Sequence, residues 1–330
     1  MDVSVIGAGA WGTACAIHLS RKGLHGALWV YEPELCDTIQ RTGENSQYLP
    51  GFRIPENIRC TPVLEEAAQA AATVIVASPS FALRALLLRA APYVTQKKVL
   101  VLTKGLETET LLRMSEVAAE ILGHNAHVAV LSGPSFAREV AEGGFTAAVV
   151  ASRHREVARF FQEMIHNEKF RIYTSDDVTG VELGGALKNV MAIGAGIMEG
   201  LHLGANAQAA FITRALAEIR RLGKVLGAKD ATFMGLSGIG DLVLTCKGPL
   251  SRNRQFGIEL AQGRKADELL RSRKTVVEGY YTIEAAQRLS KKHGVEMPIT
   301  AELYRILYEG KDVKASLEDI TGREFKEEEV

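Results

Sequence analysis

The chain opens with MDVSVIGAGAWGTACAIH (residues 1–18), and this stretch decides the fold of its first half. Gly7, Gly9 and Gly12 have the G-x-G-x-x-G spacing, and they stand between a short apolar run and a helix expected over residues 11–22. In a dinucleotide-binding turn the first glycine permits the tight turn, the second lets the backbone approach a pyrophosphate, and the third allows the helix to pack closely on the strand. The amide groups that begin the helix face the phosphates. The alternative is an ordinary strand–helix turn that contains three glycines by chance.

A carboxylate follows where the ribose of a dinucleotide would need it. Glu32 ends the second apolar run, twenty residues after Gly12. A carboxylate at that place accepts a hydrogen bond from the ribose 2′-hydroxyl, and its negative charge repels a 2′-phosphate. The sequence therefore predicts NAD as the cofactor and leaves NADP open as a second choice.

Apolar runs alternate with helical segments through the first half of the chain. Strands are expected over residues 3–8, 26–32, 73–79, 98–105, 128–134, 147–152 and 170–175. Helices are expected between them, over residues 11–22, 63–71, 80–91, 109–123 and 155–166. This βαβ repetition predicts an α/β fold with a Rossmann-type, doubly wound parallel sheet.

The pattern changes near residue 177, because the β-rich runs stop and helical periodicity continues alone. Helices are expected over residues 178–200, 205–227, 251–262, 279–292 and 299–309. We therefore predict a dinucleotide-binding domain over residues 1–177 and an all-α domain for substrate binding and catalysis over residues 178–330.

Composition and charge exclude several classes of protein. The 330 residues carry 39 basic and 39 acidic side chains, which gives no support for binding to nucleic acid or to an anionic membrane. No signal-peptide pattern is present, and Lys188 and Asn189 interrupt the best candidate for a membrane span, so no span is expected. The four cysteines are scattered and no HExxH motif occurs, so we expect no disulfide, no metal and a cytoplasmic location.

Lys188 is the strongest catalytic candidate outside the glycine turn. It stands in VELGGALKNVMAIGAGIM (181–198), where most other residues are small or apolar. A desolvated lysine has a lowered pKa and can exchange a proton near neutral pH. Asn189 can orient a hydroxyl or carbonyl group, and Asp241 can pair with Lys188 and tune its pKa. The alternative is a lysine at the edge of the helix whose ammonium reaches solvent.

Further polar groups stand at the carboxyl ends of expected strands. Lys104 closes the fourth strand, and Gly133 and Ser135 follow the fifth in LSGPSFAREV (131–140). Open parallel sheets bind ligands at that edge. The alternatives are an ordinary loop lysine and a Gly-Pro turn with a serine cap.

A second polar cluster lies in LSGIGDLVLTCKGPLSRNRQFG (236–257). It contains Thr245, and Ser251, Arg252 and Asn253 stand at an expected helix start, where such side chains suit a phosphate or an oxyanion. The alternatives are a helix cap for Ser251 and a solvated surface position for Arg252.

Taken together, these residues resemble the bacterial-type NAD(P)-dependent glycerol-3-phosphate dehydrogenases, and the resemblance extends over essentially the whole chain. Ten motifs carry it: GAGAWGTA (7–14), YLPG (48–51), ASPS (77–80), TKGLE (103–107), LSGPSFAREV (131–140), ELGGALKNV (182–190), NAQAAFITR (206–214), LSGIGDLVLTC (236–246), SRNRQFG (251–257) and VVEG (276–279). The resemblance implies that Lys188 accepts a proton, that Lys104 contacts substrate and cofactor, and that Asp241 organises the reacting end. The implied substrate contacts are Gly133, Ser135, Ser251, Arg252 and Asn253, and Asn189 and Thr245 complete the predicted substrate site.

The resemblance also implies that Trp11 and Tyr31 line the dinucleotide. The full set of predicted cofactor-binding residues is Gly7, Gly9, Ala10, Trp11, Gly12, Tyr31, Glu32, Lys104, Ala137, Arg252, Val276 and Glu278. Two positions depart from the family. Many relatives carry Ser at the position of Ala10, and the family often has Arg or His where this chain has Tyr31-Glu32, which argues against a strong NADP preference.

The implied reaction is the interconversion of sn-glycerol 3-phosphate and dihydroxyacetone phosphate, which would supply glycerophospholipid synthesis. One rival is a dehydrogenase of the same architecture that acts on a 3-hydroxyacyl or 3-hydroxy acid substrate. The other is a regulator that binds NAD(H) without turnover. A helical second domain also offers a surface for a homodimer.

Overall fold

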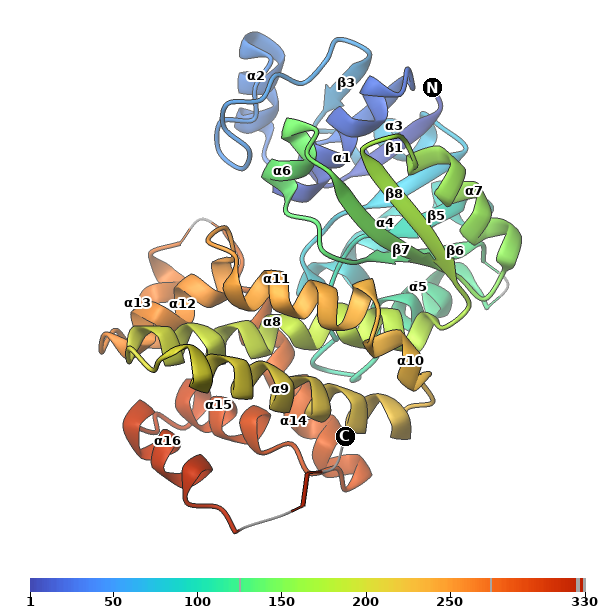
Figure 1. Cartoon of the computed structure of the whole chain (residues 1–330). Coiled ribbons are helices and arrows are strands. Elements are labelled where there is room, and N and C mark those ends of the chain that lie inside the picture. Colours follow the sequence, from blue (N-terminus) through green and yellow to red (C-terminus); the bar gives the residue numbers. More distant parts are fainter. Residues whose placement is uncertain (125, 274, 325–326, 329–330) are drawn as a thin grey trace. The chain divides into compact units, whose positions relative to one another are not determined.

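The computed structural model describes residues 1–124, 126–273, 275–324 and 327–328 (Figure 1). The chain forms two compact units. The first comprises Met1–Thr103 and Met114–Val178, and the second comprises Lys104–Arg113 and Thr179–Val330. The segment Lys104–Arg113 therefore packs with the second unit. The predicted division at residue 177 placed this segment in the first domain.

The first unit is built on one sheet of eight strands in the order β3-β2-β1-β4-β5-β6-β7-β8. The strands are β1 (Val3–Ile6), β2 (Gly26–Trp29), β3 (Ile58–Thr61), β4 (Thr73–Val76), β5 (Lys98–Val101), β6 (Val128–Ser132), β7 (Thr146–Ala151) and β8 (Phe170–Ser175). Neighbouring strands are parallel, apart from the antiparallel pair β6–β7. The predicted doubly wound parallel sheet is confirmed, with this one pair reversed.

Two groups of helices pack around this sheet (Figure 1). They are α1 (Ala10–Arg21), α2 (Pro33–Thr42), α3 (Leu64–Gln69), η1 (Ser80–Ala82), α4 (Leu83–Val94), α5 (Met114–Leu122), α6 (Ala137–Glu142) and α7 (Arg155–Ile165). α1 packs against α6 and α7, whereas α4 packs against α3 and α5. Strands β1, β2 and β4 are buried along their whole length, which is why they read as continuous apolar runs.

Two local expectations about the first unit are wrong. The predicted helix over residues 109–123 begins only at Met114, because Leu106 and Arg113 form an antiparallel bridge and Leu111 has a φ of 65°. The strand β7 runs antiparallel to β6, because the connection over residues 133–145 holds only the six-residue α6 and turns the chain straight back.

The second unit is helical. Its elements are α8 (Val178–Gly200), α9 (Ala205–Val225), α10 (Asp230–Phe233), the π-helical turn η2 (Leu236–Gly240), α11 (Asp241–Lys247), α12 (Arg252–Ala261), α13 (Ala266–Arg271), α14 (Glu278–His293), α15 (Pro298–Tyr308) and α16 (Val313–Thr321). Its core gathers Leu187, Ile193, Phe233 and Phe256, all shielded from solvent, around α8. The predicted all-α second half is confirmed.

Helix α8 is the centre of this core. Among the described residues it alone has the length and apolar composition of a membrane span, with a mean hydropathy of 1.2, and 94% of that window is buried inside the structure. The expectation that Lys188 and Asn189 exclude such a segment by composition is therefore wrong, and burial explains its apolar character. Close contacts require its glycines: a Cβ on Gly196 would lie 1.9 Å from the carbonyl oxygen of Arg254 on α12.

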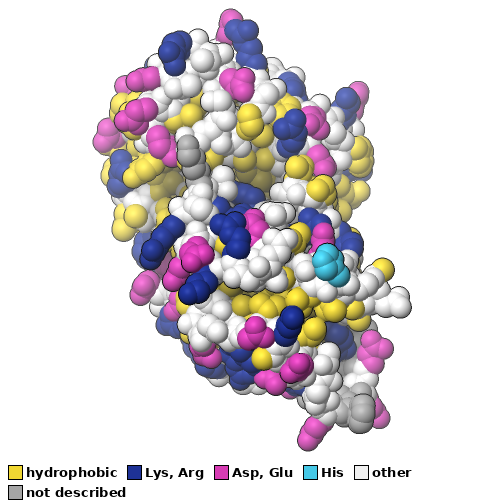
Figure 2. All heavy atoms as spheres, turned by 90° about the vertical axis from the view of Figure 1, so that its left-hand side faces the viewer, with side chains coloured by type: hydrophobic (Ala, Val, Ile, Leu, Met, Phe, Trp, Pro, Cys, Tyr) yellow, Lys and Arg dark blue, Asp and Glu magenta, His cyan; other side chains and the backbone are white. Residues whose placement is uncertain are grey.

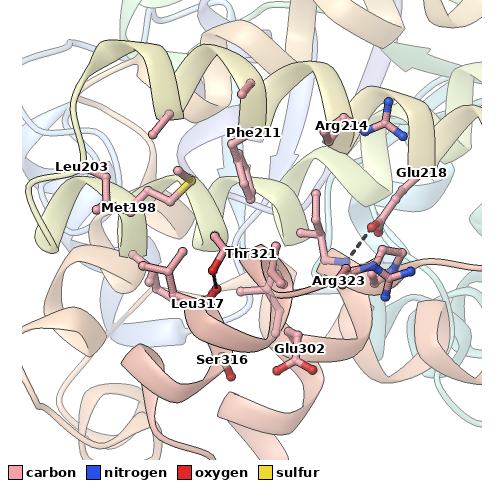
Figure 3. Close-up of a pocket in the computed structure, with 18 of the residues that line it drawn as sticks. Met198, Leu203, Phe211, Arg214, Glu218, Glu302, Ser316, Leu317, Thr321 and Arg323 are labelled. Carbon is pink, nitrogen blue, oxygen red and sulfur yellow. Dashed lines mark hydrogen bonds between the residues drawn. The ribbon is translucent and has the colours of Figure 1, made fainter. Parts of the chain in front are cut away.

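A cavity of about 930 Å³ lies between α8, α9, α15 and α16 (Figure 3). Met198, Phe211 and Leu317 form part of its apolar wall, and Glu218 reaches from α9 toward the start of α15. The Glu218 carboxylate accepts hydrogen bonds from the backbone amides of Ile299 at 2.5 Å and of Thr300 at 3.1 Å. Glu218 thus caps α15 from another helix. None of the predicted site residues lines this cavity, so we treat it as a feature of the helical core.

Charged side chains of both signs are mixed over the face drawn in Figure 2, with apolar side chains between them. This mixture agrees with the equal numbers of basic and acidic residues in the sequence. The four cysteines are buried free thiols. Within the described ranges no group of three or more His, Cys, Asp or Glu side chains is placed to hold a metal.

Candidate active site

In the glycine turn of the first unit, two of the three glycines lie so close to other backbone atoms that a side chain would not fit. Gly7 has a φ of 114°, and a Cβ there would lie 2.5 Å from the carbonyl oxygen of Ala77. A Cβ on Gly12 would lie 1.9 Å from the carbonyl oxygen of Gly7. At Gly9, by contrast, a Cβ would meet none of the described atoms within 4 Å. Gly7 and Gly12 are therefore required by the turn itself, whereas Gly9 borders open space, as the approach of a pyrophosphate requires.

The N-terminus of α1 faces the same open side of the turn. The helix begins at Ala10, with Gly9 as its N-cap and without an acidic residue in its first turn. Its first amide groups and the positive end of its dipole therefore suit an anion. Trp11 is half-buried beside them. The turn and the helix start fit the phosphates of a dinucleotide.

Two buried polar side chains that sequence reasoning missed hold this turn. Asn45 donates from Nδ2 to the carbonyl oxygen of Ala8 at 2.7 Å and to Oγ1 of Thr13 at 2.8 Å. Thr13 donates in turn to Ala8 at 3.2 Å. Both side chains are fully buried. Asn45 stands three residues before the YLPG motif, and a polar residue beside that motif was the available signal.

The carboxylate of Glu32 is held after the end of β2. The hydroxyl of Tyr48, another residue that sequence reasoning missed, donates to Oε1 of Glu32 at 2.7 Å. Within the described part of the chain, the other oxygen of Glu32 accepts no hydrogen bond. Tyr31 is 68% exposed and packs edge-on against Trp29 at 5.8 Å. An oxygen that can still accept a hydrogen bond suits a ribose hydroxyl.

The turn after β6 contains Gly133, Ser135 and Ala137. Gly133 has a φ of 141°, and a Cβ there would lie 2.8 Å from Cα of Ala148 on β7. Ser135 donates from Oγ to the carbonyl oxygen of Gly133 at 2.9 Å, and Ala137 begins α6. These contacts account for the glycine and the serine as parts of a turn, and their ligand contacts stay predictions.

In the helical unit, Lys104, Lys188 and Asp241 form one buried cluster. Lys104 Nζ lies 2.8 Å from Oδ2 of Asp241, and Lys188 Nζ pairs with Oδ1 of the same carboxylate. Asp241 is 0% exposed and Lys188 is 7% exposed. The structure therefore brings together the three predicted catalytic residues, and the alternative of a solvent-reaching Lys188 is wrong.

The cluster shifts the proton affinities of its members. Burial lowers the pKa of Lys188 to about 8, against the attraction of Asp241, and the nearby charge of Lys104 lowers it as well. Burial alone would raise the pKa of Asp241, but the two lysines outweigh burial and hold it below its ordinary value. The site thus pairs a carboxylate whose pKa is held below its ordinary value with a lysine whose pKa of about 8 lets it gain and lose a proton near neutral pH.

A close backbone contact places Asp241 against Lys188. A Cβ on Gly184 of α8 would lie 2.2 Å from the carbonyl oxygen of Ser237, so only glycine lets α8 approach η2 this closely. Asp241 begins α11 directly after η2. Thr245, one turn later, donates from Oγ1 to the backbone carbonyl of Asp241 at 2.6 Å. Its hydroxyl therefore supports the helix that carries the carboxylate.

Asn189 and Asn253 form a second buried pair beside this cluster. Asn253 donates from Nδ2 to Oδ1 of Asn189 at 3.1 Å, and its own Oδ1 accepts from the Gly279 amide at 2.9 Å. Ser251 caps α12 by accepting from the Arg254 amide at 3.2 Å. The helix-cap interpretation of Ser251 is therefore confirmed, and its contact with a phosphate stays a prediction.

Arg252 is the first residue of α12 and is exposed. Its guanidinium makes no hydrogen bond or ion pair within the described residues. Val276 is half-buried, and Glu278 is the first residue of α14. An exposed guanidinium at a helix start suits an anionic ligand.

Known proteins match the chain along almost its whole length. The family model for the N-terminus of NAD-dependent glycerol-3-phosphate dehydrogenase matches residues 2–158, and the model for the C-terminus of the same family matches residues 177–318. The glycerol-3-phosphate dehydrogenase (NAD(P)+) of Syntrophotalea carbinolica is 46% identical over 331 residues, which cover 99% of each chain. That of Geobacter sulfurreducens is 47% identical over 329 residues, which cover 99% of this chain and 98% of the relative.

A solved structure agrees with these sequence matches. The crystal structure of glycerol-3-phosphate dehydrogenase from Coxiella burnetii is 40% identical and superposes with a TM-score of 0.93, covering 98% of this chain and 99% of the other. Sequence and structure thus lead to the same assignment. The chain belongs to the NAD-dependent glycerol-3-phosphate dehydrogenase family.

Proposed function

We propose that this chain interconverts sn-glycerol 3-phosphate and dihydroxyacetone phosphate with NAD(P). The observation that carries the proposal is the buried cluster of Lys188, Asp241 and Lys104 in a chain that also holds a dinucleotide-type glycine turn. The relatives named above are glycerol-3-phosphate dehydrogenases, and they match this chain over almost their full length, which supports the same substrate. In the proposed division of labour, residues 1–177 bind the dinucleotide and residues 178–330 supply substrate binding and catalysis.

The residues of the glycine turn fit the cofactor. Gly9, Ala10 and Trp11 would hold the pyrophosphate through the start of α1, and Glu32 would accept from a ribose hydroxyl. The remaining proposed contacts are Gly7, Gly12, Tyr31, Lys104, Ala137, Arg252, Val276 and Glu278. When bound, the nicotinamide supplies the hydride acceptor for oxidation and the hydride donor for reduction.

Lys188 is the proposed proton acceptor. In its neutral form Nζ takes the proton of the C2 hydroxyl, and Asp241 stabilises the ammonium that results. In the reverse direction the same ammonium returns the proton to the carbonyl oxygen. A pKa near 8 keeps both forms of Lys188 populated close to neutral pH, which both directions need.

The proposed phosphate-binding group is Arg252, assisted by Ser251 and Asn253. The exposed guanidinium of Arg252 supports this role, since two fork-like donors match the geometry of a phosphate. Gly133, Ser135, Asn189 and Thr245 complete the proposed substrate contacts. The proposal extends to a cytoplasmic enzyme, in homodimeric form, that supplies glycerophospholipid synthesis.

Loss of NADH absorbance on addition of dihydroxyacetone phosphate is the direct test. We expect turnover with dihydroxyacetone phosphate and none with 3-hydroxy or 3-oxo acids. Turnover with an acid instead would identify the rival dehydrogenase, and NADH binding without any turnover would identify a regulator. The same assay with NADPH measures the cofactor preference.

The role of Lys188 is tested by Lys188→Ala. The variant should bind NADH normally and lose about a thousandfold or more in kcat, because it lacks the proton acceptor. Lys291→Ala removes an exposed lysine from α14 and serves as the matched control. A Lys188→Ala variant with near-normal kcat contradicts the mechanism.

A further inference from the structure

The segment Lys104–Arg113 forms a small hairpin within the helical unit, although the chain enters it from β5 and leaves it into α5. Leu106 and Arg113 are bridge partners, and the Glu107 amide donates to the carbonyl oxygen of Leu112 at 2.9 Å. The Leu106 side chain is 1% exposed and belongs to the helical core. One backbone bridge and one buried side chain therefore hold the hairpin in the helical unit.

Ion pairs fix this hairpin to the helices at both ends. At its start, Lys104 lies 2.8 Å from Asp241. At its end, Arg113 Nη1 lies 2.6 Å from Oε2 of Glu182 on α8, and the two side chains are 10% and 6% exposed. The fold accounts for Leu106, and the mechanism proposed above accounts for Lys104. Neither accounts for a buried Arg–Glu pair.

We infer that Arg113 and Glu182 are a positioning pair that holds Lys104 on Asp241, beside Lys188. This inference rests on the proposed function. Few residues separate the pair from Lys104, because Leu106, the bridge partner of Arg113, follows Lys104 by two residues. Glu182 precedes Lys188 by six residues on the same helix. The pair therefore sets the position of one catalytic lysine relative to the helix that carries the other.

The chemistry of the pair suits positioning better than stability. Removing two charges from water costs several kcal/mol, so an apolar contact of the same size would stabilise the fold equally well or better. What an apolar contact lacks is direction. The planar guanidinium accepts a carboxylate in a fixed geometry, so this pair defines where the end of the hairpin lies on α8.

The test uses Arg113→Met, Glu182→Gln and the double variant, because each single change removes one charge of this ion pair and the double change removes both. In each folded variant we expect kcat to fall about tenfold or more. The double variant should stay slow even if it regains the wild-type Tm. Arg220→Met, which breaks the ion pair between half-buried Arg220 and exposed Asp230 in the same unit, is the matched control and should keep full kcat.

A pH profile separates positioning from general loosening. The charge of Lys104 lowers the pKa of Lys188, so a displaced Lys104 should move the acidic limb of kcat/KM for oxidation to higher pH. Lys104→Met removes the charge outright and gives the reference shift. Folded variants whose acidic limb stays in place and whose kcat stays within about twofold of wild type overturn the inference. If Arg113→Met does not fold, Arg113→Lys replaces it, because lysine keeps the positive charge and lacks the planar guanidinium. The position of the acidic limb and the value of kcat are then judged in the same way.

Chemical labelling gives a readout that does not depend on the reaction. The folded full-length protein is acetylated for a set time and then digested, and mass spectrometry of the peptides measures the labelling of each lysine. Acetylation of Lys104 should be severalfold faster in the Arg113 and Glu182 variants, with exposed Lys291 as the internal standard. Unchanged labelling of Lys104 contradicts the positioning pair. An inactive wild-type protein contradicts the proposed function instead, and labelling still decides the role of the pair.

Discussion

Lys188 determines how the rate should depend on pH, because its ammonium must lose a proton before it can accept one. With a pKa of about 8, kcat/KM for glycerol 3-phosphate oxidation should rise through roughly pH 8 and level off above it. Reduction of dihydroxyacetone phosphate needs the protonated form, so its rate should fall over the same range. Initial rates in both directions between about pH 6 and pH 10 check this, and parallel profiles would contradict the assignment.

Glu32 is the residue on which the choice between NAD and NADP depends. Glu32→Ser removes the charge that would repel a 2′-phosphate, so the ratio of kcat/KM for NADPH to that for NADH should rise about tenfold or more. Tyr48→Phe is the control, because it removes the hydroxyl that holds Glu32 and leaves the charge in place. It should weaken NADH binding without favouring NADPH. An unchanged ratio in Glu32→Ser would show that another group selects the cofactor.

Single residues also mark where sequence reasoning succeeds and where it stops. Lys188 and Asp241 were predictable, because a lysine in an apolar helix needs a counter-charge. Asn45 and Tyr48 were not, because their roles depend on contacts with Ala8 and Glu32 from distant parts of the chain. Such supporting contacts follow from the tertiary fold, and the YLPG motif beside Asn45 marks the region without revealing the partners.

At the scale of elements, the cap of α15 has a pH-dependent effect on stability. Burial raises the pKa of Glu218 from 4.5 to about 7, although the amides of α15 oppose the shift. The folded state therefore binds this proton more tightly than the unfolded state, so this contribution to stability is present below about pH 4.5 and is lost as the pH rises toward 7. The loss is at most about 3 kcal/mol.

Urea unfolding at about pH 5 and pH 8 measures this effect. Glu218→Gln keeps an acceptor for the α15 amides without a titrating group, so it should lose less stability between these values than the wild type. Glu302 has a lowered pKa, with Lys311 and Arg305 outweighing its burial, so its own contribution is lost as the pH falls. That loss lies below about pH 4.5, so Glu302→Gln should leave the change between pH 5 and pH 8 as in the wild type and serves as the control. A loss of stability in Glu218→Gln equal to that of the wild type would contradict the assignment.

Elements with a clear period were predictable, and short or irregular ones were not. Residues 178–200 were predicted as one helix, and α8 covers the same span. The strand β3 has the sequence IRCT with the exposed Arg59 at its second position, so it lacks the continuous apolar run that marks β1, β2 and β4. Residues 109–113, the second half of the hairpin Lys104–Arg113, were predicted as the start of a helix, because the positive φ of Leu111 and the bridge from Arg113 to Leu106 are tertiary features.

At the scale of the whole molecule, the hairpin means that the two units are not two successive pieces of chain. A fragment of residues 1–177 would expose Leu106 and leave Arg113 without Glu182. Replacing Lys104–Arg113 in that fragment by a short Gly-Ser linker should therefore raise its Tm and reduce its aggregation. Circular dichroism and light scattering on both fragments check this. Equal behaviour would show that the hairpin does not depend on the helical unit.

The path of the chain also limits how such an enzyme can be recombined. The backbone passes from one unit to the other three times, after Thr103, after Arg113 and after Val178. A chimaera joined at a single point near residue 178 would pair the hairpin of one parent with the helices of the other, and its Lys104 would meet a foreign partner surface. Exchange of cofactor-binding units between relatives should therefore succeed only when residues 104–113 come from the same parent as the helices. Such a chimaera needs three junctions, after Thr103, after Arg113 and after Val178, instead of one.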